Sequence, residues 1–541
     1  MKRVAILLPL LVCLLALQAT AAEERLGKVE FANTCSAAVQ AQFDRGVALL
    51  HDFWYEEAKR QFQDIYSQDP NCAIAHWGAA LSVYHQIWNR PDDKALAEGW
   101  SEIQKTKSIP LNDPREREYI SAAAIFYQPG KTEYQTRVDQ YSAAMGKLYQ
   151  HYPNDVDAGA LCALSILASE EPGDTSLTHE RQALAILNPL FEKFPDHPGL
   201  AHYIIHSCDN PAMAQQGLHA AERYGDIAPS AAHSAHMPGH IFARLGMWQQ
   251  DIHANLLSVT ASEYAETKHH GDGAHSLHAY DFLLYAYLQS GQDVKAKEVV
   301  EKTGAILNQL EAMGDMEMMG MGKAFVPMYR IEFPTIYQLE RRDWNAAAAE
   351  MPNPSAPPES QLEIFWARGI AQGHLHQAEA ARANLAELAK QEELVKKGPY
   401  AYFLEGSGQK ITHGELEAWA AFAEGNEKLA IDKMRAAADL QDKVGQGEVD
   451  IPAREMLADL LLECKQHPQL ALAEYKTALK LSPNRFNRLY RAGMGAEAVG
   501  DRTTAATFYA QLLKQTDGGA NSTRPELAHA KSLSTTLTSA R

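Results

Sequence analysis

The sequence predicts an all-α protein built from repeated pairs of helices. Alanine, leucine, glutamate and glutamine recur with helical spacing from Ala37 to the C-terminal region, and signals typical of strands are scarce. A period of 34 residues is also present, because Ala471 and Tyr475 recur as Ala505 and Tyr509. A period of this length is typical of helix pairs that stack into a solenoid.

The first 22 residues have the organisation of a secretory signal peptide. Lys2 and Arg3 precede an apolar run at 4–17, and small residues follow up to Ala22. The run is too short to anchor a chain across a hydrocarbon core of about 30 Å, and no later segment resembles a membrane span. We therefore expect a cleavable signal over 1–22, a periplasmic or secreted location, and no stable membrane anchor.

The charge of the chain limits its possible partners, and its length limits its possible architectures. The 541 residues include 50 basic and 68 acidic side chains, for a formal charge of −18; without Lys2 and Arg3 the balance is 48 to 68, or −20. A surface this acidic repels phosphate backbones, so we expect no nucleic-acid partner. The chain is also longer than one globular core usually organises, which favours a repeat array or several domains.

Five cysteines follow the signal segment: Cys35, Cys72, Cys162, Cys208 and Cys464. In an oxidising compartment an odd number leaves at least one unpaired. Cys35 and Cys72 each precede the first helix of a neighbouring repeat, so a disulfide between them is geometrically conceivable. The alternative is that all five are small, buried apolar side chains.

The repeats share a residue pattern. A small residue stands where paired helices touch, a large apolar residue follows four positions later, and a proline ends the pair, as in Ala58, Phe62 and Pro70, and in Ala183, Leu187 and Pro195. This pattern resembles a degenerate tetratricopeptide repeat (TPR) over about 40–513. The resemblance implies a right-handed superhelix whose concave groove binds a peptide, a protein or a cell-envelope component.

Within this frame we divide the chain at changes of pattern. A lead-in at 23–38 precedes an N-terminal TPR-like solenoid at 39–345 with a His-rich groove; C-terminal TPR-like repeats occupy 346–516, and a polar tail at 517–541 is expected to be loosely ordered apart from a short helix near Pro525. Insertions that break the period fall at 89–110, 169–180, 260–274, 313–325 and 350–359. Such insertions map to loops, often at the binding face.

Three longer strings extend the resemblance beyond the repeat. They are ALLHDFWY at 48–55, HMPGHIFARLGMW at 236–248 and LSPNRF at 481–486. The chain thereby resembles a family of exported bacterial tetratricopeptide proteins that carries no established activity. The resemblance consequently implies no reaction, and function has to be argued from residues.

Histidines and aspartates concentrate between 202 and 281. The repeat relates them, because His202 and His206 recur 34 residues later as His236 and His240, and a further step of 45 residues takes His233 to His278 and His236 to Asp281. Three successive first helices should therefore present equivalent side chains to the groove. The candidate metal ligands are His202, His206, Asp209, His233, His236, His240, His278 and Asp281.

Imidazole and carboxylate groups that converge from three helices suit a transition metal such as Zn, Cu or Fe. Their number suggests two ions, or one ion with outer histidines that orient its ligands. The site would then belong to a binding protein or to a metal-dependent hydrolase or oxidase. The alternative is a His-rich hydrogen-bonding surface without metal. We find no Gly-rich phosphate loop, His-Glu-x-x-His motif or nucleophile elbow.

Local features refine these expectations. Pro238 should begin a helix, which makes His236 and His240 safer candidates than His233. His51 lies several repeats before the cluster, so a capping or groove role is its default explanation. Methionines crowd into 313–321, where we expect a flexible apolar cover, with Cu(I) binding as the alternative.

Overall fold

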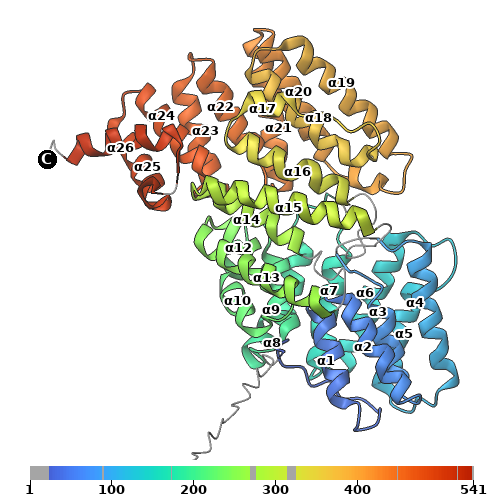
Figure 1. Cartoon of the computed structure of the whole chain (residues 1–541). Helices are drawn as coiled ribbons and strands as arrows, with labels where there is room; N and C mark the ends of the chain where they lie inside the picture. The colour runs from blue at the N-terminus through green and yellow to red at the C-terminus, as the bar shows by residue number, and fades with distance from the viewer. Residues whose placement is uncertain are drawn as a thin grey trace, which may run out of the picture.

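A computed structural model describes residues 24–87, 90–171, 173–268, 276–313, 325–447, 449–520 and 522–538. Over these residues the structure consists of helices, with no strand, and successive helices pack as neighbouring pairs. The chain runs from the blue N-terminal helices through the green central ones to the yellow and red C-terminal ones (Figure 1). The predicted all-α, TPR-like solenoid is therefore confirmed. In the described part no helix is long and apolar enough to cross a membrane.

The described residues between 24 and 313 form helices α1 to α15 and the 3-10 turn η1. Several helices begin at an aspartate that accepts a hydrogen bond from a backbone N–H in the first turn, as Asp92, Asp113 and Asp155 do. The helices are α1 Gln40–His51, α2 Tyr55–Gln68, α3 Ala73–Leu81, α4 Asp93–Lys105, η1 Thr106–Ser108, α5 Pro114–Tyr127, α6 Tyr134–His151, α7 Val156–Ala168, α8 Thr178–Lys193, α9 Pro198–Cys208, α10 Ala214–Ile227, α11 Ala232–His236, α12 Pro238–Arg244, α13 Trp248–Lys268, α14 Ser276–Gln289 and α15 Asp293–Met313.

The helices after residue 324 continue the pairing. They are α16 Phe325–Glu340, α17 Trp344–Ala349, α18 Pro358–His374, α19 Ala378–Val395, η3 Ala401–Leu404, α20 Gly408–Ala423, α21 Glu427–Val444, α22 Ala453–Glu463, α23 Pro468–Leu481, α24 Phe486–Ala498, α25 Arg502–Gln515, η4 Asp517–Gly519 and α26 Pro525–Thr538.

The small-and-large pattern of the repeat is a packing requirement. Phe62 is fully buried, and a Cβ on Gly78 would lie 2.4 Å from its ring. Tyr509 occupies the same position in a late repeat, and a Cβ on Gly493 would lie 2.3 Å from its ring. Each aromatic ring thus fills the space that a side chain on the facing helix would need.

The tail packs more than its polar composition suggests. The helix expected near Pro525 is α26, and its Leu527 and Ala530 are buried. The guanidinium of Arg524 donates hydrogen bonds to the Asp293 carboxylate and the Leu288 carbonyl. The few apolar residues of the segment fall on one helix face, which is enough to hold it against α25.

Cys35 and Cys72 form a disulfide that joins the segment before α1 to the start of α3. The other three cysteines described, Cys162, Cys208 and Cys464, are buried thiols. The pairing conceived from the sequence is thus present, and the alternative of small apolar side chains holds for the remaining three.

Reduction of this disulfide is expected to destabilise the N-terminal repeats. The bridge spans 37 residues, and loop-closure entropy for such a span corresponds to about 4 kcal/mol. A Cys72→Ala variant should therefore unfold at lower urea concentration than the parent. Thiol titration in denaturant should find three reactive thiols before reduction in a chain cleaved after Ala22; five would contradict the pairing.

The C-terminal repeats fold back onto the centre of the array. The Trp248 indole donates a hydrogen bond to the Asn484 carbonyl at 2.6 Å, and the Asn484 amide donates to the Gly246 carbonyl at 3.1 Å. Gly246 has a φ of +64°, and a Cβ there would lie 2.4 Å from the Pro483 carbonyl. The strings at 236–248 and 481–486 are therefore in contact.

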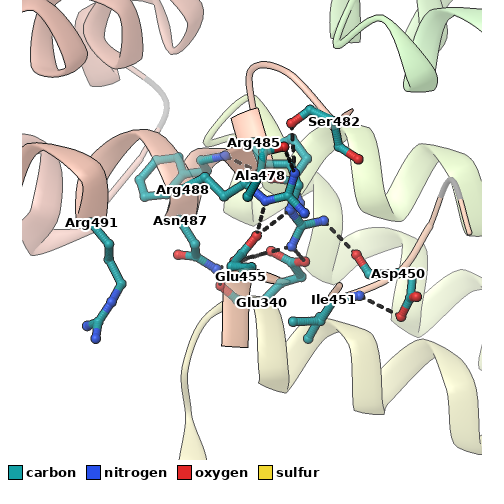
Figure 2. A network of polar contacts seen from close by, with 12 residues as sticks. Glu340, Asp450, Ile451, Glu455, Ala478, Ser482, Arg485, Asn487, Arg488 and Arg491 are labelled. Carbon is teal, nitrogen blue, oxygen red and sulfur yellow. Dashed lines mark hydrogen bonds and ion pairs between the residues drawn. The ribbon is translucent and has the colours of Figure 1, made fainter. Parts of the chain in front are cut away.

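A buried ion-pair network reinforces this contact. Arg485 bonds Glu340 of α16 at 2.6 Å and Glu455 of α22 at 2.7 Å, and Arg488 also bonds Glu455 at 2.7 Å. Figure 2 shows the two guanidinium groups around these carboxylates, with the Asp450 carbonyl as a further acceptor. The network joins three repeats and holds the C-terminal part against α16.

Candidate metal centre

Three histidines converge between α9 and α11. His202 and His206 lie one turn apart on α9, and His233 comes from α11. The Nε2 atom of His202 is 3.1 Å from that of His233 and 3.0 Å from that of His206. We call this set the first triad.

A second triad repeats the arrangement one helix pair later. His236 ends α11, His240 lies on α12 and His278 on α14. The Nε2 atoms of His236 and His240 are 2.9 Å apart, and one nitrogen of each of the three rings lies within 4.8 Å of the others. The helix also enters at Pro238 as expected, so that His233 and His236 fall on one short helix and serve different triads.

The two triads are related by the repeat offsets found in the sequence. His202 and His206 correspond to His236 and His240 after 34 residues, and His233 corresponds to His278 after 45. Adjacent rings of the two triads are close, since the His206 and His240 ring centroids lie 6.4 Å apart and those of His233 and His236 lie 6.1 Å apart. The same arrangement of three histidines thus occurs on two successive helix pairs.

The outer nitrogens of three rings face acceptors. Nδ1 of His202 lies 2.6 Å from the His51 carbonyl, Nδ1 of His236 lies 2.6 Å from Oδ1 of Asn255, and Nδ1 of His240 lies 2.9 Å from Oδ2 of Asp209. The Asn255 amide nitrogen donates to Asp251, which fixes its oxygen towards His236. These contacts assign the proton to Nδ1 and a lone pair to Nε2 in each neutral ring.

In the second triad two unprotonated nitrogens face each other. With Nδ1 protonated on both rings, neutral His236 and His240 present two lone pairs to each other at 2.9 Å. Such an approach is repulsive unless a cation, either a proton or a metal ion, lies between the nitrogens. Burial and neighbouring imidazoles hold the pKa of His202 and of His233 well below the usual range, so these rings are neutral near pH 7.

Asp209 and Asp281, the two carboxylates among the predicted ligands, lie outside both triads. Asp209 accepts from His240 through one oxygen and from the Arg244 guanidinium, at 3.0 Å, through the other. Asp281 on α14 lies against Glu332 of α16, whose pKa is raised to about 7 by burial. The structure therefore brings six of the eight predicted ligands together in two sets.

Aromatic rings cover the triads. The Phe53 ring centroid lies 4.4 Å from that of His202 and 5.5 Å from that of His233, while Phe282 lies 4.7 Å from both His236 and His240. Phe53 has a φ of +55°, an unusual conformation for a non-glycine residue, and this places its ring against the first triad. Each triad thus has an apolar side that limits access of water.

His51 is closer to the cluster than its sequence position suggested. Helix α1 packs against α9, so the expectation that His51 lies several repeats away was wrong, and its carbonyl is the acceptor for His202. Its own ring belongs to a third buried group, with Asp157 and His197. The Nε2 atoms of His51 and His197 lie 3.0 and 3.1 Å from Oδ1 of Asp157. Burial opposes ionisation of Asp157, but these two hydrogen bonds hold its pKa below the usual range.

Both triads border one cavity of about 680 Å³. His206 and His233 line it from the first triad, and His240 and His278 from the second. The insertion at 169–180 contributes acidic side chains, in agreement with the expectation that insertions reach the binding face. Tyr402 and Val444 close it from the C-terminal repeats. The methionine-rich segment at 313–321 lies outside the described residues apart from Met313, which ends α15.

Sequence reasoning missed the supports of the triads. Asn255 stands on α13, a second helix, where the repeat pattern indicates no groove position. Phe53 and Tyr402 come from repeats far from the cluster in sequence. The string ALLHDFWY at 48–55 contains Phe53 and was the one available signal for these supports.

No protein-family model matches the chain, and no curated protein matches its sequence. Solved structures with a similar fold include a human IFIT1 dimer with PPP-AAAA, at 12% identity and a TM-score of 0.36, where 87% of this chain and 88% of that chain are covered. Another is Naa15/Naa10 bound to HypK-THB, at 12% identity and a TM-score of 0.23, covering 93% and 82%. These similarities concern the helical fold alone.

Proposed function

We propose that the groove binds two transition-metal ions, one in each histidine triad, and that the protein is a metal-dependent enzyme acting on a ligand in the shared cavity. The facing Nε2 lone pairs of His236 and His240 carry the proposal. A single proton between two Nε2 atoms would relieve the repulsion in one pair of rings, but it would not bind the third ring of the triad. Three imidazoles around one point, repeated twice, are the donor set of a metal ion.

The donor set indicates the metal. Imidazole suits zinc, copper and iron, whereas magnesium and calcium prefer oxygen ligands. Nitrogens around a tetrahedral ion with bonds of about 2.0–2.1 Å are about 3.3 Å apart. Three Nε2 separations, His202 to each of its two partners and His236 to His240, are 2.9 to 3.1 Å and so lie close to this value. All ligand nitrogens of a triad lie within 4.8 Å of one another, so an ion requires only that the rings shift.

Three protein ligands favour a reactive site over a structural one. Structural zinc sites are closed by four protein ligands, whereas catalytic sites keep a position open. Here the open side of both triads faces the cavity. Bound zinc would supply Lewis-acid and hydroxide chemistry, and copper or iron would supply oxidation, which corresponds to a hydrolase or an oxidase. The chain's own residues position the rings, through Asp209, Asn255 and the His51 carbonyl.

The cavity size indicates the class of occupant. Small-ligand sites are about 300–1,000 Å³, so a cavity of about 680 Å³ takes a small molecule or a side chain of a peptide. A protein or cell-envelope component bound by the solenoid would therefore present one such group to the metals. This is the form in which we propose partner binding.

Elemental analysis of protein purified from its native compartment without a histidine tag tests the proposal. We expect close to two zinc, copper or iron ions per chain. Removal with a chelator should abolish activity, and addition of the same metal should restore both ions. Protein that is metal-free as purified, and that takes up no metal from a buffered solution, would leave a proton as the cation between His236 and His240.

An Asp209→Asn variant is expected to weaken the second site selectively. The asparagine cannot hold the His240 Nδ1 proton as a carboxylate does, and losses of outer partners typically cost ten- to a hundredfold in metal affinity. Competition with a chelator should show one weakened and one unchanged ion. Asp226→Asn, at an exposed carboxylate on α10, is the matched control and should change neither.

We also propose export with cleavage near Ala22, which the signal-like first 22 residues support. A disulfide is typical of oxidising compartments and agrees with this location. N-terminal sequencing of protein from the periplasmic fraction tests it, because retention of Lys2 in that protein would contradict cleavage.

A further inference from the structure

One wall of the metal-facing cavity is acidic. Glu170, Asp174 and Glu180, from the insertion between α7 and α8 and the first turn of α8, line the same cavity as the histidines. Arg90 is the one arginine or lysine on the cavity lining that the structure describes. Its guanidinium is already held by the Glu405 carboxylate at 2.6 and 3.1 Å. Asp174 has the His179 ring beside it at 3.6 Å, whereas Glu170 and Glu180 have no arginine or lysine partner on the described lining.

Glu180 makes this wall more than a cluster of acids. Its side chain is nine-tenths buried, and its Oε2 atom is buried without a hydrogen-bond partner among the described residues. A buried carboxylate oxygen without a donor is costly, and an incoming donor removes that cost. Burial and the neighbouring carboxylates of Glu180 and Asp174 also raise the pKa of Glu170 to about 7, as expected where negative charge accumulates.

The spacing of the carboxylates argues against a third metal ion. Three groups of histidine and acidic residues have ligand atoms close enough to hold an ion in the described part of the chain, and none includes Glu170, Asp174 or Glu180. An ammonium group on a flexible chain can donate up to three hydrogen bonds to separated acceptors. Two tyrosines, Tyr134 and Tyr402, line the same cavity, and the Arg90 guanidinium lies 5.0 and 5.4 Å from their ring centroids. These rings hold Arg90 to one side, so the carboxylates are the acceptors left for an ammonium group.

We propose that the acidic wall of Glu170, Asp174 and Glu180, with Glu180 as its buried acceptor, is the subsite for a primary alkylammonium group of the cavity ligand. The ligand is then an amine, either free or as the side chain of lysine in a peptide. As a substrate class this rests on the proposed metal-dependent activity, but ammonium binding itself needs no metal. The wall recognises the charged end of the ligand, and the triads face the remainder.

Calorimetric titration of the full-length mature protein, both as purified and after chelation, tests this subsite. The probes are n-hexylamine against 1-hexanol, and a blocked Gly-Lys-Gly tripeptide against its norleucine counterpart. We expect each cationic probe to bind at least about tenfold more tightly than its neutral counterpart in both forms of the protein. Tighter binding of the lysine tripeptide than of hexylamine identifies a peptide as the ligand, and the reverse identifies a free amine.

Glu180→Gln should abolish the preference for the cationic probe, since it keeps the side-chain shape and removes the charge. Glu192→Gln, at an exposed position on the same helix, is the control and should keep the preference. Urea midpoints and helical content verify that both variants fold. Equal binding of amine and alcohol, or an unchanged preference in folded Glu180→Gln, overturns the subsite. Metal content is measured in the same samples, so a failure of the metal proposal is seen separately.

Discussion

Protein with His206→Ala is expected to retain one metal ion per chain, and protein with His240→Ala the other, while the double variant retains none. Each substitution removes one imidazole from a different triad and leaves two ligands, too few to hold an ion against a chelator. The remaining triad keeps all three rings and its outer partners. Elemental analysis after dialysis against a chelator measures the three stoichiometries.

His253→Ala is the matched control for these variants. His253 is an exposed histidine on α13, near the cluster in sequence but not a member of either triad. Its replacement should leave both ions bound. Loss of both ions from either single variant, with unchanged helical content, would show one shared site and would contradict two independent triads.

Replacing Glu455 by alanine is expected to destabilise the protein by about 3–5 kcal/mol, since two buried guanidiniums lose their common partner. Arg485 and Arg488 are fully buried, and both donate to Oε2 of Glu455 (Figure 2). Glu340 still accepts from Arg485, but Arg488 is left without a carboxylate partner. The urea midpoint, followed by circular dichroism, measures the loss.

The control removes an ion pair of the same kind at the surface. Glu424 pairs with Arg382 at 2.7 Å, and both side chains are exposed, so Glu424→Ala should cost at most about 1 kcal/mol. Glu455→Gln keeps the shape of the side chain and should fall between the two. A Glu455→Ala midpoint equal to that of Glu424→Ala would mean that the network does not hold the C-terminal repeats in place.

Local and periodic features of this protein could be predicted from its sequence. Alanine and aromatic residues at fixed positions indicated helix pairs, and the packing of Phe62 against Gly78 recurs as that of Tyr509 against Gly493. The 34-residue offset placed His202 and His206 in the slots of His236 and His240. The 45-residue offset related His233 to His278 in the same way, because an insertion lengthens a loop without changing the position of a residue within its repeat.

Long-range packing could not be predicted from the same patterns. Nothing in the period indicates that α1 meets α9, and so the contact of His51 with His202 was missed. The assignment of Asp209 and Asp281 as ligands followed from spacing alone. A spacing of three places Asp209 near His206, but the side chain turns to His240 and Arg244 of the next repeat, where its charge has two donors.

Diffraction from crystals of the native protein at the absorption edge of its metal tests the two-ion centre most directly. We predict two anomalous peaks, one about 2.0–2.2 Å from the Nε2 atoms of His202 and His206, the other at that distance from His236 and His240. Each peak should also have a nitrogen of His233 or His278 as its third ligand. Ordered density for both triads with no anomalous peak between the rings would contradict the metal centre.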